Sequence, residues 1–176
     1  MQLETALHIL GIEDLRPFQK EALNTLLTGR NLLTLMPTSA GKSLIFTSFA
    51  MVQERLTIVI EPHLALELDQ VRQLHDKGVA AACLNSLHSS AERKSVLAQI
   101  EQGELLLLFV TPEMLQNRKV QTALRQADAS ARLCLYLVIL GHILPVAAGR
   151  RAARGKRKTK CQGKAKGQQS KQPFQN

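Results

Sequence analysis

The sequence has very few aromatic side chains. Its 176 residues include five Phe, one Tyr and no Trp, which together make up 3% of the chain. Hydrophobic residues nevertheless account for 45%, an ordinary fraction for a globular protein. The core must therefore be built from Leu, Ile, Val and Ala. The length allows one domain with a sizeable core and hardly two.

Cysteine is equally scarce. The chain has three, an odd number, and they are widely spaced: Cys83, Cys134 and Cys161. This arrangement fits neither a disulfide framework nor a zinc module, and it is typical of a protein in a reducing compartment. The first residues, Met1–Glu4, lack the basic segment and the long apolar run of a secretory signal. We therefore expect an intracellular protein.

A long uninterrupted apolar run is also missing. Residues 133–149 come closest, but Gly141, His142 and Pro145 interrupt them. A membrane-spanning helix needs about 20 mostly apolar residues. A buried strand that continues into irregular chain is therefore the favoured interpretation, and we expect no membrane partner.

Acidic residues are missing from the end of the chain. Residues 1–149 contain 13 Lys and Arg against 14 Asp and Glu, whereas residues 150–176 contain the other 10 basic residues and no acidic one. The formal charge of +9 therefore belongs to the tail and not to the globular part. Gly, Gln, Lys and Arg dominate there, and such a composition buries too little apolar surface to offset the entropy of ordering. We expect residues 141–176 to form a basic, low-complexity, disordered tail.

The most informative stretch that is present is Met36–Ser43. It follows an apolar, strand-like run, Asn31–Leu35, and precedes a helix-like run, Leu44–Gln53. A small-residue turn between a strand and a helix points backbone N–H groups and the helix N-terminus at a polyphosphate. Lys42 would reach the β- and γ-phosphates, and the Ser43 hydroxyl would hold Mg²⁺. The alternative is a chance Gly-Lys-Ser sequence after a turn.

One position of this loop departs from the general phosphate-loop pattern. In G-x-x-x-x-G-K-[ST] the first position is Gly, and here it is Met36. The predicted phosphate-binding residues are Pro37, Thr38, Ser39, Ala40, Gly41, Lys42 and Ser43.

Strand-like and helix-like segments alternate along the rest of the chain. Such alternation predicts an α/β fold with a parallel sheet flanked by helices, whose ligands bind at the carboxyl ends of the strands. Helices are predicted over Thr5–Leu10, from Pro17, over Leu64–His75, from Ser89 to about Gln102 and from Pro112, and strands over Leu56–Ile60, Gly78–Leu84, Leu105–Val110 and Leu133–Leu140.

Five distinctive stretches occur in order along residues 8–139. They are Leu15–Gln19, Met36–Ser43, Val59–Leu66 with Asp69 and Gln70, Ala82–Ser86, and Phe109–Glu113. Together they resemble the first motor lobe of superfamily-two helicases, and most closely the RecQ family of ATP-dependent DNA helicases. The resemblance implies an incomplete RecA-like ATP-binding lobe over residues 29–140. A helical segment, residues 1–28, would carry the adenine-recognition motif.

The resemblance also implies roles for individual residues. Gln19 would read the adenine edge, because an amide offers a donor beside an acceptor, and Arg16 would assist it. The family often has an aromatic ring near Ile12 to stack on adenine, and this chain has none. The alternative for Gln19 is an exposed helix residue without a ligand.

DNA contacts are implied at the loops that follow three of the strands. Pro62, Asn85 and Thr111 would lie along the path of single-stranded DNA, where small polar groups suit phosphate contacts. Ordinary loop placement is the alternative for each. Glu61 and His63 depart from the family pattern, and a carboxylate near a phosphate path opposes DNA binding, modestly if it is exposed.

The family's Asp-Glu-x-His segment is missing. The predicted strand arrives on schedule at Leu135–Ile139, but Leu140–His142 follows, and no acidic residue occurs after Asp128. These acids orient Mg²⁺ and the attacking water, and a second lobe supplies the arginine finger. We therefore predict that this chain alone neither hydrolyses ATP usefully nor unwinds DNA. The abrupt change after Ile139 also suggests a frameshift, altered splicing or an erroneous gene model, which the nucleotide sequence would test.

The basic tail has three interpretations. It is a nuclear-localisation patch, a nonspecific nucleic-acid arm, or sequence without a selected function. From this tail we expect the protein to be located in the nucleus if the organism is a eukaryote, and in the cytoplasm or nucleoid otherwise. Two functions therefore remain: the ATP-binding part of a helicase, or a noncatalytic nucleic-acid-binding protein. A third possibility is that the chain is too short to fold, since its sheet would have an exposed edge that favours aggregation. The candidate DNA contacts in the tail are Arg150, Arg151, Lys156, Arg157 and Lys158.

Overall fold

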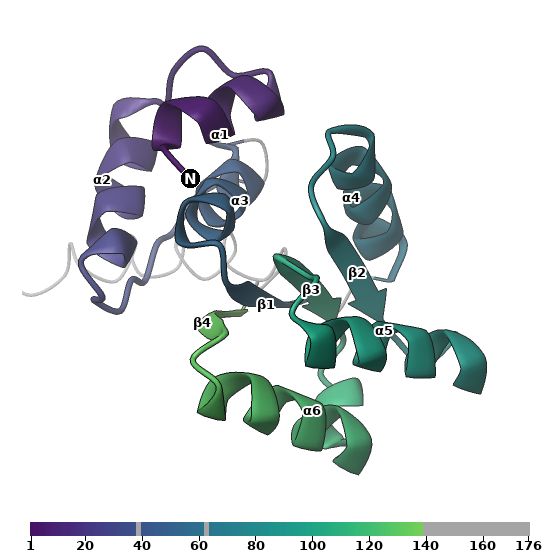
Figure 1. Ribbon diagram of the computed structural model, residues 1–176. Helices are drawn as coiled ribbons and strands as arrows, with labels where there is room; N and C mark the ends of the chain where they lie inside the picture. Colours follow the sequence, from purple (N-terminus) through teal and green to yellow (C-terminus); the bar gives the residue numbers. More distant parts are fainter. Residues whose placement is uncertain (38–39, 62–63, 139–176) are drawn as a thin grey trace, which may run out of the picture. The chain divides into compact units, whose positions relative to one another are not determined.

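The computed structural model describes residues 1–37, 40–61 and 64–138 (Figure 1). The chain alternates helices and strands as the sequence predicts. The helices are α1 (Leu3–Leu10), α2 (Pro17–Leu27), α3 (Lys42–Gln53), α4 (Leu64–Asp76), α5 (Ser90–Gln102), a short 3-10 helix η2 (Met114–Gln116) and α6 (Arg118–Ala129). The strands are β1 (Leu56–Ile60), β2 (Ala81–Leu84), β3 (Leu107–Val110) and β4 (Leu133–Val138).

The four strands form one parallel sheet in the order β2-β3-β1-β4. Parallel strands are joined by helical crossovers that cover both faces, so their side chains are apolar on both sides. Every residue of β2 and β3 is buried, and so are the first four of β1. The predicted α/β class with a parallel sheet is confirmed.

Successive residues of each strand enter different core clusters. Ile58 and Leu108 pack with α5 and α6, whereas their neighbours Val59, Leu107 and Phe109 pack with α1, α3 and α4. Figure 1 shows α5 and α6 together on one side of the sheet. This alternation follows from the two-residue period of a strand.

The amino-terminal helices form a third cluster around α3. Residues of α1 and α2, with Leu15 between them, pack against Ile45 and Phe49 of α3. α1 ends at Gly11, whose φ of 71° is accessible to glycine at low cost, and Pro17 occupies the first turn of α2. Both predicted helix ends are confirmed, and the effect is to bring α2 beside the loop that precedes α3.

Several element boundaries differ from the prediction. The helix expected from Pro112 begins at Arg118, because the chain first forms a 3-10 turn and the Asn117 side chain then caps α6. β2 begins at Ala81, since the N–H of Val79 still bonds to the carbonyl of Leu74 in α4. α5 agrees with the prediction, and its cap is a reciprocal pair of hydrogen bonds between Ser89 and Glu92.

The strand predicted over Asn31–Leu35 is absent from the structure, and this prediction is wrong. Residues 31–36 form neither a strand nor a helix. A strand exists only where a neighbour completes its hydrogen-bond ladder. Among the described residues no such neighbour reaches this segment. None of the described helices is both long enough and apolar enough to cross a bilayer.

Candidate phosphate-binding site

The predicted phosphate loop leads directly into α3. Gly41 caps this helix with a φ of 79°, and no side chain among the described residues caps it in the usual way. The first N–H groups of a helix and its positive dipole end together attract an anion. Thr38 and Ser39 lie outside the described residues. The described part of the loop therefore presents a helix N-terminus suited to an anionic group.

Lys42 lies across the loop. Its Nζ donates to the carbonyl oxygens of Met36 and Pro37, each at 3.3 Å. Carbonyl oxygens are weaker acceptors for an ammonium group than phosphate oxygens, because only the latter carry a formal charge. The loop thus places a cation beside an uncapped helix end, and the residues fit a phosphate group. Ser43 follows in the first turn of α3, where its side chain is exposed.

Gln19 connects α2 to this loop. Its side chain is buried, with 3% exposure. Its Nε2 donates to the carbonyl oxygens of Ala40 at 3.1 Å and Gly41 at 3.4 Å, and its Oε1 accepts from the N–H of Arg16 at 2.9 Å. Both amide atoms are therefore used within the chain, and the alternative of an exposed helix residue is wrong. A role in reading adenine stays a prediction.

Two features favour glycine at position 41. Its backbone is left-handed, and a Cβ there would lie 2.6 Å from the Gln19 Nε2 atom. A side chain at position 41 would therefore require the Gln19 amide to move away from the loop backbone, where it now donates to the carbonyl oxygens of Ala40 and Gly41. The conformation of the loop depends on a residue 22 positions earlier in the chain.

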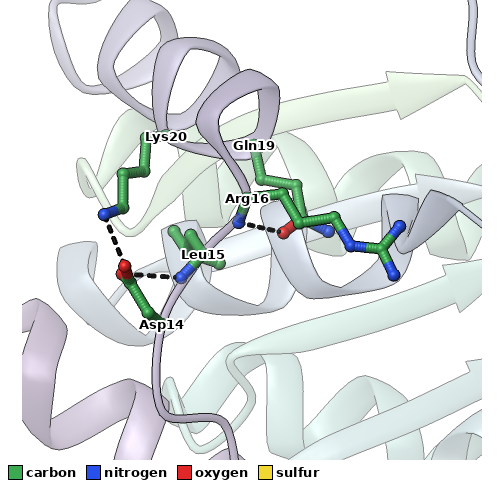
Figure 2. A network of polar contacts seen from close by, with 5 residues as sticks. All are labelled: Asp14, Leu15, Arg16, Gln19 and Lys20. Carbon is green, nitrogen blue, oxygen red and sulfur yellow. Dashed lines mark hydrogen bonds and ion pairs between the residues drawn. The ribbon is translucent and has the colours of Figure 1, made fainter.

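Arg16 is the extended residue directly before α2, and its backbone N–H donates to Gln19 Oε1. Figure 2 shows its side chain extending away from Asp14 and Lys20. These two form an exposed ion pair of 2.7 Å, and the hydrogen bond from Lys20 lowers the pKa of Asp14 below its ordinary value. The Arg16 side chain lines one groove with Pro37 and Ala40, so the structure brings it to the predicted loop.

Three polar residues follow neighbouring strands at one edge of the sheet. Glu61, Asn85 and Thr111 come directly after β1, β2 and β3, whose last residues pair with one another. All three side chains are buried, with 3%, 1% and 1% exposure. Any contact of Asn85 or Thr111 with DNA would therefore involve the backbone or a rearrangement, and such contacts stay predictions. The sequence did not indicate that Glu61 is buried.

Asn85 organises a turn that sequence reasoning missed. Its Oδ1 accepts from the N–H of Leu87 at 3.1 Å and lies 2.8 Å from His88 Nδ1. His88 Nε2 lies 3.8 Å from Cys83 Sγ at the end of β2. An Asn side chain often accepts from the backbone N–H two residues later, so the turn at Asn85 could have been predicted from the sequence. The contact of Asn85 with His88 could not, because no sequence pattern indicated it. Pro62, His63 and the five tail residues predicted to bind DNA lie outside the described residues.

No metal-binding cluster of three or more His, Cys, Asp or Glu side chains occurs in the described parts of the chain. Ser43 is thus the described candidate for a metal contact. A metal ion held there would depend on oxygen atoms of a bound phosphate for most of its coordination.

Comparison with known proteins extends these observations. Residues 16–139 match the family described as DEAD/DEAH box helicase. The "ATP-dependent DNA helicase RecQ" of Synechocystis is 43% identical over 125 residues, which cover 70% of this chain and 26% of that protein. The "ATP-dependent DNA helicase Q-like 2" of Arabidopsis thaliana is 34% identical over 138 residues, which cover 77% of this chain and 20% of that protein. The chain therefore spans about a quarter or less of these relatives.

A solved structure shares the fold. The crystal structure of the helicase MrfA bound to DNA and AMPPNP superposes with a TM-score of 0.63 at 19% identity, covering 77% of this chain and 20% of that chain. At this level of identity the likeness concerns the fold alone. The family match covers well over half of the chain and includes the predicted loop, so the chain belongs to the DEAD/DEAH box helicase family and is homologous to the N-terminal part of RecQ DNA helicases.

Proposed function

We propose that this chain binds ATP with Mg²⁺ through the loop before α3, as the nucleotide-binding part of a RecQ-like DNA helicase. The observation that carries the proposal is the position of Lys42. Its ammonium group lies across the loop, held by carbonyl oxygens of Met36 and Pro37, at a helix N-terminus without a side-chain cap. A polyphosphate would supply the negative charge that this arrangement lacks.

Each residue of the loop has a role in this proposal. Lys42 exchanges its two carbonyl partners for β- and γ-phosphate oxygens, and backbone N–H groups of Gly41 and the first turn of α3 hold the phosphates. The Ser43 hydroxyl contacts Mg²⁺, which supplies charge neutralisation. The remaining contacts come from Pro37, Thr38, Ser39 and Ala40.

We propose that Arg16 and Gln19 border the adenine. Gln19 reaches the loop carbonyls in the structure, so base recognition by its amide requires it to exchange at least one of these bonds. Nucleotide binding would then change the contact between α2 and the loop. This coupling gives the base site a means to influence the phosphate site.

The catalytic consequence is limited. The relatives named as DNA helicases are much longer proteins, of which this chain covers 26% and 20%, so helicase activity and a role in DNA repair or recombination are proposed for the whole protein and not for this chain alone. No Asp or Glu follows β4 in the sequence, so the acid that would orient Mg²⁺ and water is missing from the expected place. We propose ATP binding with severely impaired hydrolysis, and DNA contacts at Pro62, Asn85 and Thr111.

The test is calorimetric titration of ATP and Mg²⁺ into the purified chain. We expect saturable one-to-one binding, and Lys42→Ala should weaken it by at least about tenfold, since the substitution removes a charge-assisted contact. Lys119→Ala, an exposed lysine in the first turn of α6, is the matched control and should leave binding unchanged. Absence of binding by a chain with native circular dichroism, or equal binding by Lys42→Ala, would contradict the proposal.

A second candidate function rests on the tail. Ten basic and no acidic residues in 150–176 favour noncatalytic binding of nucleic acid. Changing Lys156, Arg157 and Lys158 together to Gln should reduce the slope of log affinity for single-stranded DNA against log salt by about 2. Under this function Lys42→Ala should leave DNA affinity unchanged. A slope that does not respond to the triple change would exclude the tail as the binding element.

A further inference from the structure

A basic groove lies between α5 and α6, the two helices that Figure 1 shows together on one side of the sheet. It has a volume of about 350 Å³ and is lined by the amino-terminal parts of both helices with Asn117. No Asp or Glu lines it. We call it the α5–α6 groove, and its cationic lining residues are Arg93, Lys94, Arg118 and Lys119.

The charge of this groove is not balanced by the chain. In the described residues the ion pairs are those of Met1 with Glu54 and of Lys20 with Asp14, so none of the four cations is paired with an acid. Residues 1–149 as a whole contain 13 basic and 14 acidic residues, so a concave surface with cations alone is a local concentration of charge. A cleft lined by one sign of charge attracts ligands of the opposite sign.

The groove also has an apolar part. Leu97 and Val120 line it, and both pack with the core cluster that holds α5 and α6 against the sheet. Leu97 is half-buried, so part of its side chain stays accessible. One cation is fixed beside this surface, because Arg93 Nε donates to the carbonyl oxygen of His88 at 3.0 Å. An occupant that matches the groove therefore combines anionic groups with an apolar side chain.

The ends of the two helices favour carboxylates over phosphates. Phosphates are often held by the free N–H groups of a helix N-terminus. Here Ser89 Oγ accepts from the N–H of Glu92 at 3.2 Å, and Asn117 Oδ1 accepts from the N–H of Lys119 at 3.0 Å. Both helices are thus capped by their own side chains, and the attraction comes from the flexible cations, which form charge-assisted hydrogen bonds with carboxylates.

We propose that the α5–α6 groove docks an acidic peptide segment of a partner protein. Carboxylates of the peptide pair with the cations of the groove, and one apolar side chain of the peptide contacts Leu97. A phosphodiester backbone would supply the charge but not the apolar side chain. The chain's own tail does not fit, because residues 150–176 contain ten basic residues and no acidic one. The proposal is independent of ATP binding.

The test uses the full chain and two short labelled peptides of equal charge. In one, Asp and Glu residues flank two leucines, and in the other the leucines are serines. Fluorescence anisotropy measures their binding at low ionic strength, where exposed charges are least screened. The basic tail attracts both peptides alike, because they carry the same charge. The preference for the leucine peptide therefore measures the groove.

Two matched double variants locate the binding. The groove variant combines Lys94→Glu with Arg118→Glu, two exposed residues that line the groove. Glu at position 118 lies in the first turn of α6, where a negative charge is favourable, so the fold is retained. The control combines Arg72→Glu with Arg125→Glu, which are also exposed, make the same change in net charge and lie outside the groove. Far-UV circular dichroism checks the fold of both variants.

We expect the leucine peptide to bind about fivefold or more tightly than the serine peptide. The groove variant should weaken the leucine peptide by about tenfold or more, and the control variant by less than about twofold. Equal affinity for the two peptides, no binding by the folded chain, or equal effects of the two variants would overturn the proposal. A labelled oligothymidylate whose binding the groove variant weakens more than that of the leucine peptide would also overturn it, and would assign the groove to nucleic acid.

Discussion

Replacement of Gly41 by alanine tests the contact between α2 and the phosphate loop most directly. Two costs apply. A left-handed backbone conformation costs a residue with a Cβ about 1–2 kcal/mol. The new methyl group would also lie 2.6 Å from Gln19 Nε2, and such overpacking costs about 1–3 kcal/mol. Gly41→Ala should therefore lower the free energy of unfolding by about 2–5 kcal/mol.

Two comparisons separate the costs. Gly11→Ala is the control for backbone strain, because Gly11 has a similar φ of 71° and a Cβ at that position would meet only open space. It should lose only about 1–2 kcal/mol. In a Gln19→Ala background the obstructing amide is absent, so Gly41→Ala should cost about as little as Gly11→Ala. The coupling energy of Gly41 and Gln19 in this double-mutant cycle should be about 1–3 kcal/mol.

The assay is urea unfolding followed by far-UV circular dichroism, with the slope m checked for constancy across the variants. The reasoning would be refuted if Gly41→Ala cost no more than Gly11→Ala. It would also be refuted if removal of the Gln19 side chain left the cost of Gly41→Ala unchanged. Either result would mean that the loop and α2 adjust independently.

Two further predictions concern the sheet and a helix cap. Phe109 has no exposed surface and packs edge-on against Phe46, with 6.2 Å between the ring centroids. Phe109→Ala should lower the free energy of unfolding, measured with urea, by about 3–5 kcal/mol. A loss under about 1 kcal/mol would show that the sheet is not the core. Hydrogen bonds from Ser89 lower the pKa of Glu92 below its ordinary 4.5, so the carboxylate stabilises the fold above that pH and the contribution is lost as pH falls through the lowered pKa. The difference in free energy of unfolding between wild type and Glu92→Gln should therefore shrink on acidification. Glu101→Gln is the control. A difference that does not depend on pH, or an equal trend in Glu101→Gln, would contradict the prediction.

Local sequence chemistry determined the helix ends and the fold class. Gly11 ends α1, Pro17 opens α2, and Ser89 with Glu92 caps α5, each through contacts within a few residues. The continuous apolar runs of β1 and β3 were recognisable as strands buried on both faces. The phosphate loop could be predicted because its candidate residues are consecutive in the chain, and its binding of phosphate stays a prediction.

Tertiary structure decided what depends on distant partners. The apolar run at Asn31–Leu35 has strand composition, but a strand requires a neighbour and the described chain places none beside it. The strand order β2-β3-β1-β4 and the burial of Glu61 follow from packing between elements, which no local pattern encodes. Gln19 was recognisable from its motif, but its bonds to Ala40 and Gly41 arise only because α2 and α3 pack together.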